Sequence, residues 1–278
     1  MFEYIKSIIF GIVEGITEWL PVSSTGHLIL LNEFLKLDVT EAFYEMYQVV
    51  IQLGAILAVI VLFFHKLNPF SPKKDQKQKT RTWILWAKVV VAVIPSAVIG
   101  LLLDDWMDAN FYNAWVVAAM LILYGIAFIL VERRNKGHAP KIKNCNEIDY
   151  RTAILMGAFQ CLSLIPGTSR SGSTILGGIL LGVSRTAASE FSFFMAIPVM
   201  VGASGIKALG FLSYVSESGI SVPAMAWVVL LVGCAVSFAV SMAAIRFLMD
   251  FVKKHSFAPF GIYRIALGAL VLILGLIR

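Results

Sequence analysis

Two carboxylates lie one helical turn apart near the start of the chain, within a stretch that is otherwise apolar. Glu14 and Glu18 are four residues apart, so on a helix both side chains lie on one face. Proteins hold a hard divalent cation such as Mg²⁺ through one or two carboxylates together with phosphate oxygens and water. The pair is therefore a candidate metal site. A solvated pair at the membrane interface is the alternative.

A run of hydroxyl groups follows the second carboxylate. Ser23, Ser24, Thr25 and Gly26 directly precede an apolar segment that begins near His27. If this segment is a helix, its first N–H groups and the positive end of its dipole form a site for an anion. His27 is a candidate for proton transfer, although a single histidine is also often a packing residue.

A second cluster of the same kind lies in the segment PGTSRSGST, residues 166–174. Its centre is Arg170, whose fixed fork of donors matches phosphate oxygens. A structural salt bridge to either glutamate is the alternative role, and the two roles are compatible. The other candidate substrate-binding positions of this cluster are Ser169, Ser171, Gly172 and Thr174.

Acids for a metal ion, hydroxyl and N–H donors for an oxyanion, a guanidinium and a histidine are the groups that phosphoryl transfer requires. We therefore expect a phosphate or diphosphate substrate within the membrane plane. In hydrolysis, Ser24 is either the nucleophile or a donor that orients water, and Glu18 or His27 accepts the proton. Gln52 and Arg264 are further intramembrane polar residues and candidate substrate-binding positions, which either brace this site or make only helix–helix contacts.

The elements that must position these residues are membrane helices. Apolar residues make up 59% of the 278 residues, against about 45–50% in a soluble domain. Six stretches of about twenty residues with few charges are long enough to cross a bilayer. They are Phe43–Phe64, Trp83–Leu103, Ala114–Val131, Phe191–Leu212, Met225–Met249 and Pro259–Ile277. The sequence predicts an all-α polytopic membrane protein with six transmembrane helices.

The basic residues indicate topology. The net charge of +6 does not point to nucleic acid, because the Lys and Arg residues cluster in loops. Residues 66–81, 133–143 and 253–254 carry such clusters, and the positive-inside tendency places these loops in the cytoplasm. The intervening loops, Asp104–Asn110 and Ser213–Ser221, have no Lys or Arg and are expected outside. Three widely spaced cysteines indicate neither a disulfide framework nor a zinc site.

Two further apolar stretches are broken in the middle, where the chemical residues cluster. Tyr4–Leu37 is interrupted at Pro21 and Gly26, and Tyr150–Val183 is interrupted around Pro166. The pieces are too short to span a bilayer, so we expect two re-entrant helical hairpins. Two proline-kinked full spans are the alternative.

The two breaks resemble each other. Ser23 and Ser169 are 146 residues apart, as are Gly26 and Gly172. Residues 1–146 and 147–278 then form two repeats within one membrane domain, each with one hairpin and three spans. Three crossings per repeat invert the second repeat relative to the first, as in inverted-repeat transporters. The two breaks would then meet near the midplane, with both termini outside.

The motifs carry a specific resemblance to a known family. EGITEWLPVSSTGH (14–27) and PGTSRSGST (166–174) resemble the signatures of bacterial undecaprenyl-diphosphate phosphatases of the bacitracin-resistance (BacA) type. The similarity extends to VIQLGAILAV (50–59), ASEFSFFMAIPVM (188–200) and IYR (262–264).

This resemblance implies a multi-pass hydrolase of the bacterial inner membrane whose pocket opens to the external side. Such an enzyme uses Mg²⁺ or Ca²⁺ to release the terminal phosphate of a C55 isoprenoid diphosphate, which recycles the lipid carrier for wall synthesis and is associated with bacitracin resistance. The resemblance implies the following roles: Glu14 and Glu18 as the acidic pair, Ser24 and Thr25 as hydroxyls near the phosphate, His27 in proton transfer, and Ser169 and Arg170 as phosphate contacts.

A different class of function uses the same architecture. Inverted repeats with broken helices are typical of secondary carriers, so a transporter or flippase of an isoprenoid phosphate is the alternative. Expected partners are the isoprenoid lipid and membrane lipids, and not nucleic acid. A homodimer is left open.

Overall fold

The computed structural model describes residues 2–111 and 113–277, with the backbone alone at residues 104, 105, 108, 276 and 277. Residues 1, 112 and 278 lie outside the described part. Within it the regular structure is helical, apart from one isolated bridge between Ile142 and Val183. The prediction of an all-α fold is confirmed.

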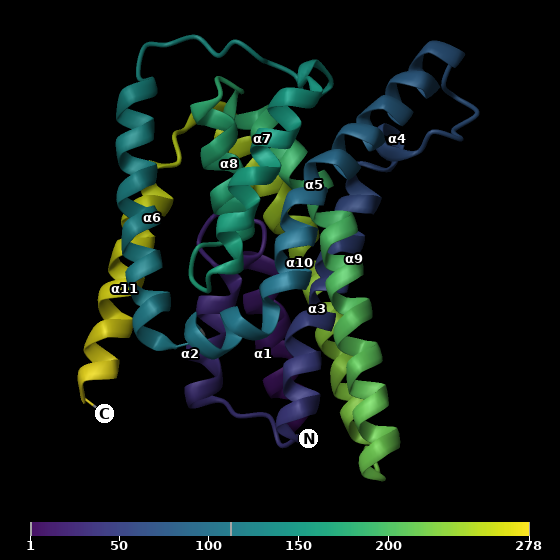
Figure 1. Cartoon of the computed structure of the whole chain (residues 1–278), viewed down its shortest axis with the longest axis vertical. Coiled ribbons are helices and arrows are strands. Elements are labelled where there is room, and N and C mark those ends of the chain that lie inside the picture. Colours follow the sequence, from purple (N-terminus) through teal and green to yellow (C-terminus); the bar gives the residue numbers. More distant parts are fainter. Residues whose placement is uncertain (1, 112, 278) are drawn as a thin grey trace.

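Six long helices form the body of the molecule (Figure 1). Each contains a stretch that is long and apolar enough to cross a bilayer, so the six predicted spans are confirmed and the chain is a multi-pass membrane protein. They are α3 (Glu41–Leu62), α5 (Gln76–Phe111), α6 (Ala114–Asn135), α9 (Arg185–Ser218), α10 (Ala224–Lys254) and α11 (Ala258–Ile277).

Two segments predicted as outer loops are largely helical. α5 continues through residues 104–110 to Phe111, and α9 continues to Ser218. A lack of Lys and Arg bears on which side of the membrane a segment lies, but a helix ends only where capping or chain geometry stops it. α9 stops at Gly219, which takes the left-handed conformation (φ 65°) that commonly ends helices.

Four shorter helices flank the two breaks. α1 (Phe2–Thr17) and α2 (Ser24–Phe34) lie on either side of the first break; α7 (Tyr150–Cys161) and α8 (Arg170–Leu180) lie on either side of the second. None exceeds 16 residues, fewer than the about twenty needed to span a bilayer. In Figure 1, α1 and α2 lie in the lower half and α7 and α8 in the upper half. The remaining short helices are α4 (Phe64–Leu67), η1 (Cys145–Glu147) and η2 (Leu162–Leu164).

The two breaks share one backbone conformation. Among the described residues, Ser23 (φ 74°) and Ser169 (φ 73°) are the only non-glycine residues with positive φ. Each is the N-cap of the following helix, and each hydroxyl accepts a hydrogen bond from the N–H of the glycine three residues later, at 3.3 Å from Gly26 and 3.1 Å from Gly172. This match supports the predicted repeat; its inversion across a membrane stays a prediction.

The packing of the helices follows the same repeat. α1 packs on α10 and α7 packs on α5, so the first helix of each half lies against the middle long helix of the other half. Both contacts use glycine. A Cβ added to Gly11 would lie 2.7 Å from the Gly233 carbonyl oxygen, and a Cβ added to Gly157 would lie 1.8 Å from the Ala92 carbonyl oxygen. Small residues allow this close backbone approach between membrane helices.

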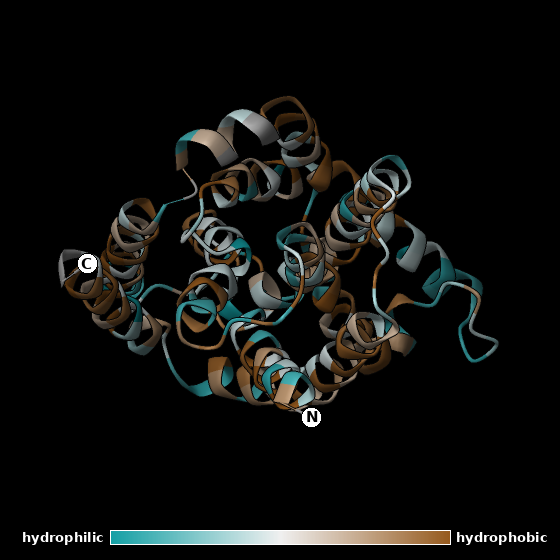
Figure 2. Ribbon diagram, turned by 90° about the horizontal axis from the view of Figure 1, so that it is seen from below, coloured by the Kyte–Doolittle hydropathy of each residue, from teal (hydrophilic) through white to brown (hydrophobic). Residues whose placement is uncertain are grey.

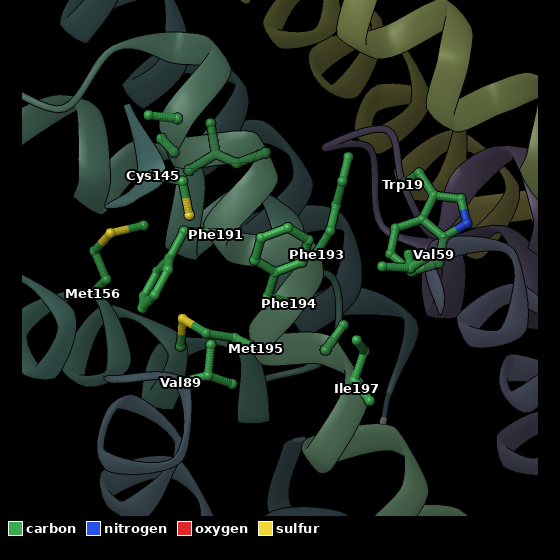
Figure 3. Close-up of a cluster of buried hydrophobic side chains, with 14 of the residues drawn as sticks. Trp19, Val59, Val89, Cys145, Met156, Phe191, Phe193, Phe194, Met195 and Ile197 are labelled. Carbon is green, nitrogen blue, oxygen red and sulfur yellow. The ribbon is translucent and has the colours of Figure 1, made fainter. Parts of the chain in front are cut away.

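In the largest apolar core, the first break packs against α9 through Trp19. Figure 3 shows Phe191, Phe193 and Phe194 on α9, with Trp19 to one side. The fully buried Trp19 packs edge-on against Phe193, with ring centroids 5.1 Å apart.

The outside of the molecule is apolar as well. Leu101, Leu102 and Leu209 are at least 70% exposed. Figure 2, which views the helices end-on, shows hydrophobic residues on the outer helices as well as inside. This surface suits a lipid surrounding.

Candidate active site

The two breaks meet through one ion pair. The Arg170 guanidinium donates to Oε1 of Glu18 from Nη2 at 3.0 Å and from Nε at 3.3 Å, although the residues are 152 positions apart. Both side chains are nearly buried, at 10% and 6% exposure. Arg170 also donates to the Ser192 carbonyl oxygen at 2.8 Å, and its guanidinium lies over the ring of Trp19. The guanidinium is therefore held in one orientation beside the carboxylate.

The second oxygen of Glu18 accepts a hydrogen bond from Ser24. The distance from Ser24 Oγ to Glu18 Oε2 is 2.6 Å, and both groups are buried. A carboxylate at this distance from a hydroxyl is placed to accept its proton. Glu18 thus connects a candidate nucleophile in the first break with a guanidinium from the second.

Glu14, one turn earlier on α1, is fully buried and lacks hydrogen-bond donors. Neither of its carboxylate oxygens has a partner among the described residues. A buried carboxylate needs either a proton or a cation, because desolvating an unpaired charge is very costly. The donor set therefore fits a divalent cation at Glu14 and Glu18. No group of three or more His, Cys, Asp or Glu occurs in the part of the chain that the structure describes, so other oxygens would have to complete such a site.

His27 has partners other than Ser24. Its Nδ1 lies 2.7 Å from the Ser23 carbonyl oxygen and its Nε2 lies 2.7 Å from the Tyr263 hydroxyl, with the two rings stacked. A carbonyl only accepts, so Nδ1 carries a proton, and in the neutral ring Nε2 accepts from the Tyr263 hydroxyl. The Ser24 hydroxyl therefore donates its hydrogen bond to Glu18 and not to His27.

Tyr263 is a site residue that the sequence analysis missed. Only its place in the segment IYR, beside Arg264, connected it with the motifs. It is about half exposed, at 47%. A tyrosine in a membrane helix has many packing roles, so nothing in its local sequence indicates a histidine partner.

Several predicted substrate contacts have partners within the protein. The hydroxyls of Ser23 and Ser169 cap their helices. Ser171 Oγ lies 3.2 Å from the Glu18 carbonyl oxygen and links the two breaks. Thr174 Oγ1 donates to the Arg170 carbonyl oxygen at 2.8 Å. These hydroxyls shape the breaks, whereas the hydroxyl of Thr25 has no hydrogen bond among the described residues.

The starts of two helices converge on the same point. α2 begins at Ser24 and α8 begins at Arg170, and these residues are joined through Glu18. The first-turn N–H groups of a helix and its positive dipole end attract anions. Gly26 and Gly172 leave the third position of each helix without a side chain. Two helix starts that converge in this way suit a strongly anionic group such as a diphosphate.

Arg264 forms hydrogen bonds with both breaks. It is fully buried and donates to the Pro21 carbonyl oxygen at 3.1 Å, and to the carbonyl oxygens of Gly167 and Thr168 at 2.8 and 3.0 Å. Further contacts reach the Leu121 and Met120 carbonyl oxygens on α6. Its donors are thus used by backbone carbonyls, so the structure places Arg264 as a support of the site. Gln52 lies half-buried on α3, with no described hydrogen bond to the other site residues.

Comparison with known proteins decides the family. A family model described as bacitracin resistance protein BacA matches residues 7–270. The chain belongs to the BacA family. The matched range includes both breaks as well as Tyr263 and Arg264, so the BacA match covers the whole candidate site.

Relatives in this family are similar over nearly their full lengths. The undecaprenyl-diphosphatase of Enterococcus faecalis is 58% identical over 267 residues, which cover 96% of this chain and 95% of that protein. The undecaprenyl-diphosphatase of Streptococcus mutans is 57% identical over 278 residues, covering 100% and 98%. That of Lactiplantibacillus plantarum is 55% identical over 272 residues, covering 98% of each chain.

Proposed function

We propose that this protein hydrolyses undecaprenyl diphosphate to undecaprenyl phosphate and inorganic phosphate, and so recycles the lipid carrier for cell-wall synthesis and confers bacitracin resistance. The observation that carries this proposal is the chain of contacts from Ser24 through Glu18 to Arg170, where the starts of α2 and α8 meet. The same activity is named for relatives at 55–58% identity.

The geometry suits two routes to the same products. In one route Ser24 Oγ attacks the terminal phosphorus while Glu18 takes its proton, the bond to the bridging oxygen breaks, and undecaprenyl phosphate leaves. Water then hydrolyses the phosphoserine. In the other route Ser24 orients a water molecule, which attacks directly.

The remaining groups stabilise the transferring phosphoryl group. In this proposal Arg170 and the first N–H groups of α2 and α8 donate to the oxygens on which negative charge develops; such preorganised donors are among the largest contributions to catalysis. Thr25 brings a further hydroxyl.

A divalent cation, Mg²⁺ or Ca²⁺, belongs to this proposal. Glu14 and Glu18 would hold it; the unpartnered carboxylate oxygens of Glu14 support this assignment. When bound, such a cation neutralises charge on the diphosphate oxygens.

We further propose that the site faces the external side of the bacterial inner membrane. In Figure 1 the two termini lie at the lower end of the molecule, while α4 and the connection from α6 to α7 lie at the upper end. The basic clusters 66–81 and 133–143 belong to that upper end, which supports a cytoplasmic assignment. The first break is then reached from outside.

The test is phosphate release by purified protein. With undecaprenyl diphosphate and Mg²⁺ or Ca²⁺ in detergent, the wild type should release inorganic phosphate, and Arg170→Ala should lower kcat by about 10²–10³-fold. Gly205→Ala is the matched control, because an added Cβ there meets no atom within 4 Å. A wild type that binds the lipid without releasing phosphate would support a transporter instead.

A further inference from the structure

A basic cavity lies at the end of the helix bundle where α6 and α10 finish and α9 begins. Its volume is about 690 Å³. No Asp or Glu is among its lining residues, whereas six of them are basic. The six are Arg134, Lys136, His138, Lys141, Arg185 and Lys253.

Two of these cations have carboxylate partners and others do not. Arg185 pairs with Glu132, and Lys253 pairs with Asp250 at 2.8 Å. Arg134, Lys136 and Lys141 form no ion pair within the part of the chain that the structure describes. The cavity therefore keeps an excess of positive charge that a ligand can neutralise.

The basic loop is held in place by hydrogen bonds. The N–H groups of Lys141 and Ile142 donate to the Gly182 carbonyl oxygen at 2.9 and 3.1 Å, and the Ser184 N–H donates to the Ile142 oxygen at 2.8 Å. Ser184 Oγ also donates to the Lys143 oxygen at 3.0 Å. Charges that serve only to set topology need no fixed position. Here the loop is tied to the junction between α8 and α9, and two of its lysines, Lys136 and Lys141, line the cavity.

One wall of the cavity is apolar. It is formed by Ile179, Leu180, Leu181 and Val252, and Leu180 is 41% exposed. A membrane lipid offers a chain for such a wall and a charged group for the cations. Apart from His138 the lining has no aromatic side chain on which a base could stack, so the composition does not suit nucleic acid.

We propose that this cavity binds the headgroup of an anionic phospholipid. Basic pockets between membrane helices on the cytoplasmic side recognise such headgroups. The phosphate lies among Arg134, Lys136 and Lys141, and an acyl chain runs along Leu180. This site is at the far end of α8 from Arg170, so its occupation does not depend on the proposed hydrolysis.

The experiment uses the full chain in detergent and native mass spectrometry with dioleoyl phosphatidylglycerol. The double variant Lys136→Gln, Lys141→Gln should bind this lipid about tenfold more weakly than the wild type. The matched control is Lys73→Gln, Lys77→Gln, which removes two exposed charges from another basic loop that does not line the cavity. The control should bind within about twofold of the wild type.

Further measurements distinguish an anionic phospholipid from a neutral lipid and from free phosphate. Dioleoyl phosphatidylcholine should bind weakly, and inorganic phosphate should not compete at millimolar concentration. Equal losses in the two double variants would overturn the proposal, because they would reveal general charge attraction. Equal binding of both lipids, or displacement of the lipid by inorganic phosphate, would overturn it too. Without added lipid, the lysine variant should melt at the same temperature as the wild type, which verifies that the variant is folded. Raised salt should weaken lipid binding to the wild type, which tests the charge dependence without any variant.

Discussion

At the scale of single residues, the site depends on one carboxylate that contacts two groups. Glu18 accepts from Ser24 on one oxygen and from Arg170 on the other. The guanidinium holds Oε1 and so fixes the orientation of the carboxylate. The second oxygen, Oε2, then faces the Ser24 hydroxyl. A proton acceptor held in this way loses little entropy when it acts.

Replacing Glu18 by Gln tests its role as the proton acceptor. The amide keeps the size of the side chain but cannot take a proton, so kcat for phosphate release should fall by about 10²–10⁴-fold. Gly205→Ala should keep normal turnover. Wild-type kcat in Glu18→Gln would show that the proton goes elsewhere.

Rapid-quench trapping distinguishes the two routes for Ser24. If Ser24 is the nucleophile, a substrate labelled in its terminal phosphate leaves label on the protein, and Ser24→Ala abolishes it. If Ser24 orients water, no label is trapped, and Ser24→Ala keeps a residual rate. A labelled Ser24→Ala protein would contradict the assignment of this serine.

Tyr263 should orient His27 without being essential. Tyr263→Phe removes one hydrogen bond, a net loss of about 1 kcal/mol, and keeps the stacked ring. We expect a decrease in kcat/KM of about fivefold, since 1.4 kcal/mol corresponds to tenfold. A much larger loss, like that of Arg170→Ala, would mean that the Tyr263 hydroxyl acts on the substrate itself.

At the scale of elements, the site exists because two helix starts are held together. Arg264 from α11 donates to carbonyl oxygens at both breaks, and the caps at Ser23 and Ser169 shape the two first turns alike. Carbonyls at a chain break have no helical partner, so a buried guanidinium that satisfies several of them stabilises both breaks at once.

Arg264→Lys separates support from substrate binding. A lysine has one compact ammonium group and cannot reach carbonyls in both breaks. We expect a lower melting temperature together with lower kcat. A substrate ligand would behave differently, with a raised KM and an unchanged melting temperature.

Gly157→Ala should push α7 away from α5. The added Cβ would lie 1.8 Å from the Ala92 carbonyl oxygen, so the helices must separate. Overpacking of this kind costs about 1–3 kcal/mol and should lower the melting temperature. Gly205→Ala, on the open side of α9, should leave it unchanged or slightly higher, because alanine favours helix over glycine. An unchanged melting temperature in Gly157→Ala would mean that the two helices are not in close contact.

At the scale of the whole molecule, the two halves exchange partners. The first helix of each half packs on the middle long helix of the other half, while α8 also packs on α9 of its own half. Such an arrangement brings the ends of both breaks to one place inside the bundle. The predicted membrane orientation follows from the same arrangement and the basic loops.

Cysteine labelling in intact cells tests this orientation. With Cys145, Cys161 and Cys234 replaced by alanine, a membrane-impermeant maleimide should label Ser221→Cys but leave Lys73→Cys unlabelled until the cells are opened. Both positions are exposed, so accessibility within the protein is matched. Labelling of Lys73→Cys in intact cells would contradict the external assignment of the site.

The sequence by itself determined the six long helices, the two breaks and the residue types gathered at them. These features depend on local patterns, because lipid requires long apolar helices and rejects unpaired charges unless they have a function. The motifs at 14–27 and 166–174 were also sufficient for the family resemblance, which the BacA match confirmed. The outer ends of α5 and α9 were mispredicted, since charge patterns indicate a side of the membrane and not where a helix ends.

Only the tertiary structure decided which groups contact one another. The pairing of Glu18 with Arg170 spans 152 residues, and that of His27 with Tyr263 spans 236. The sequence had offered a salt bridge from Arg170 to either Glu14 or Glu18, and the structure selected Glu18. The partner of His27 could not be inferred, because a hydrogen-bond partner depends on which segments come together in space. For the same reason the sequence left Arg264 with two roles, and its carbonyl partners in both breaks assigned it to support.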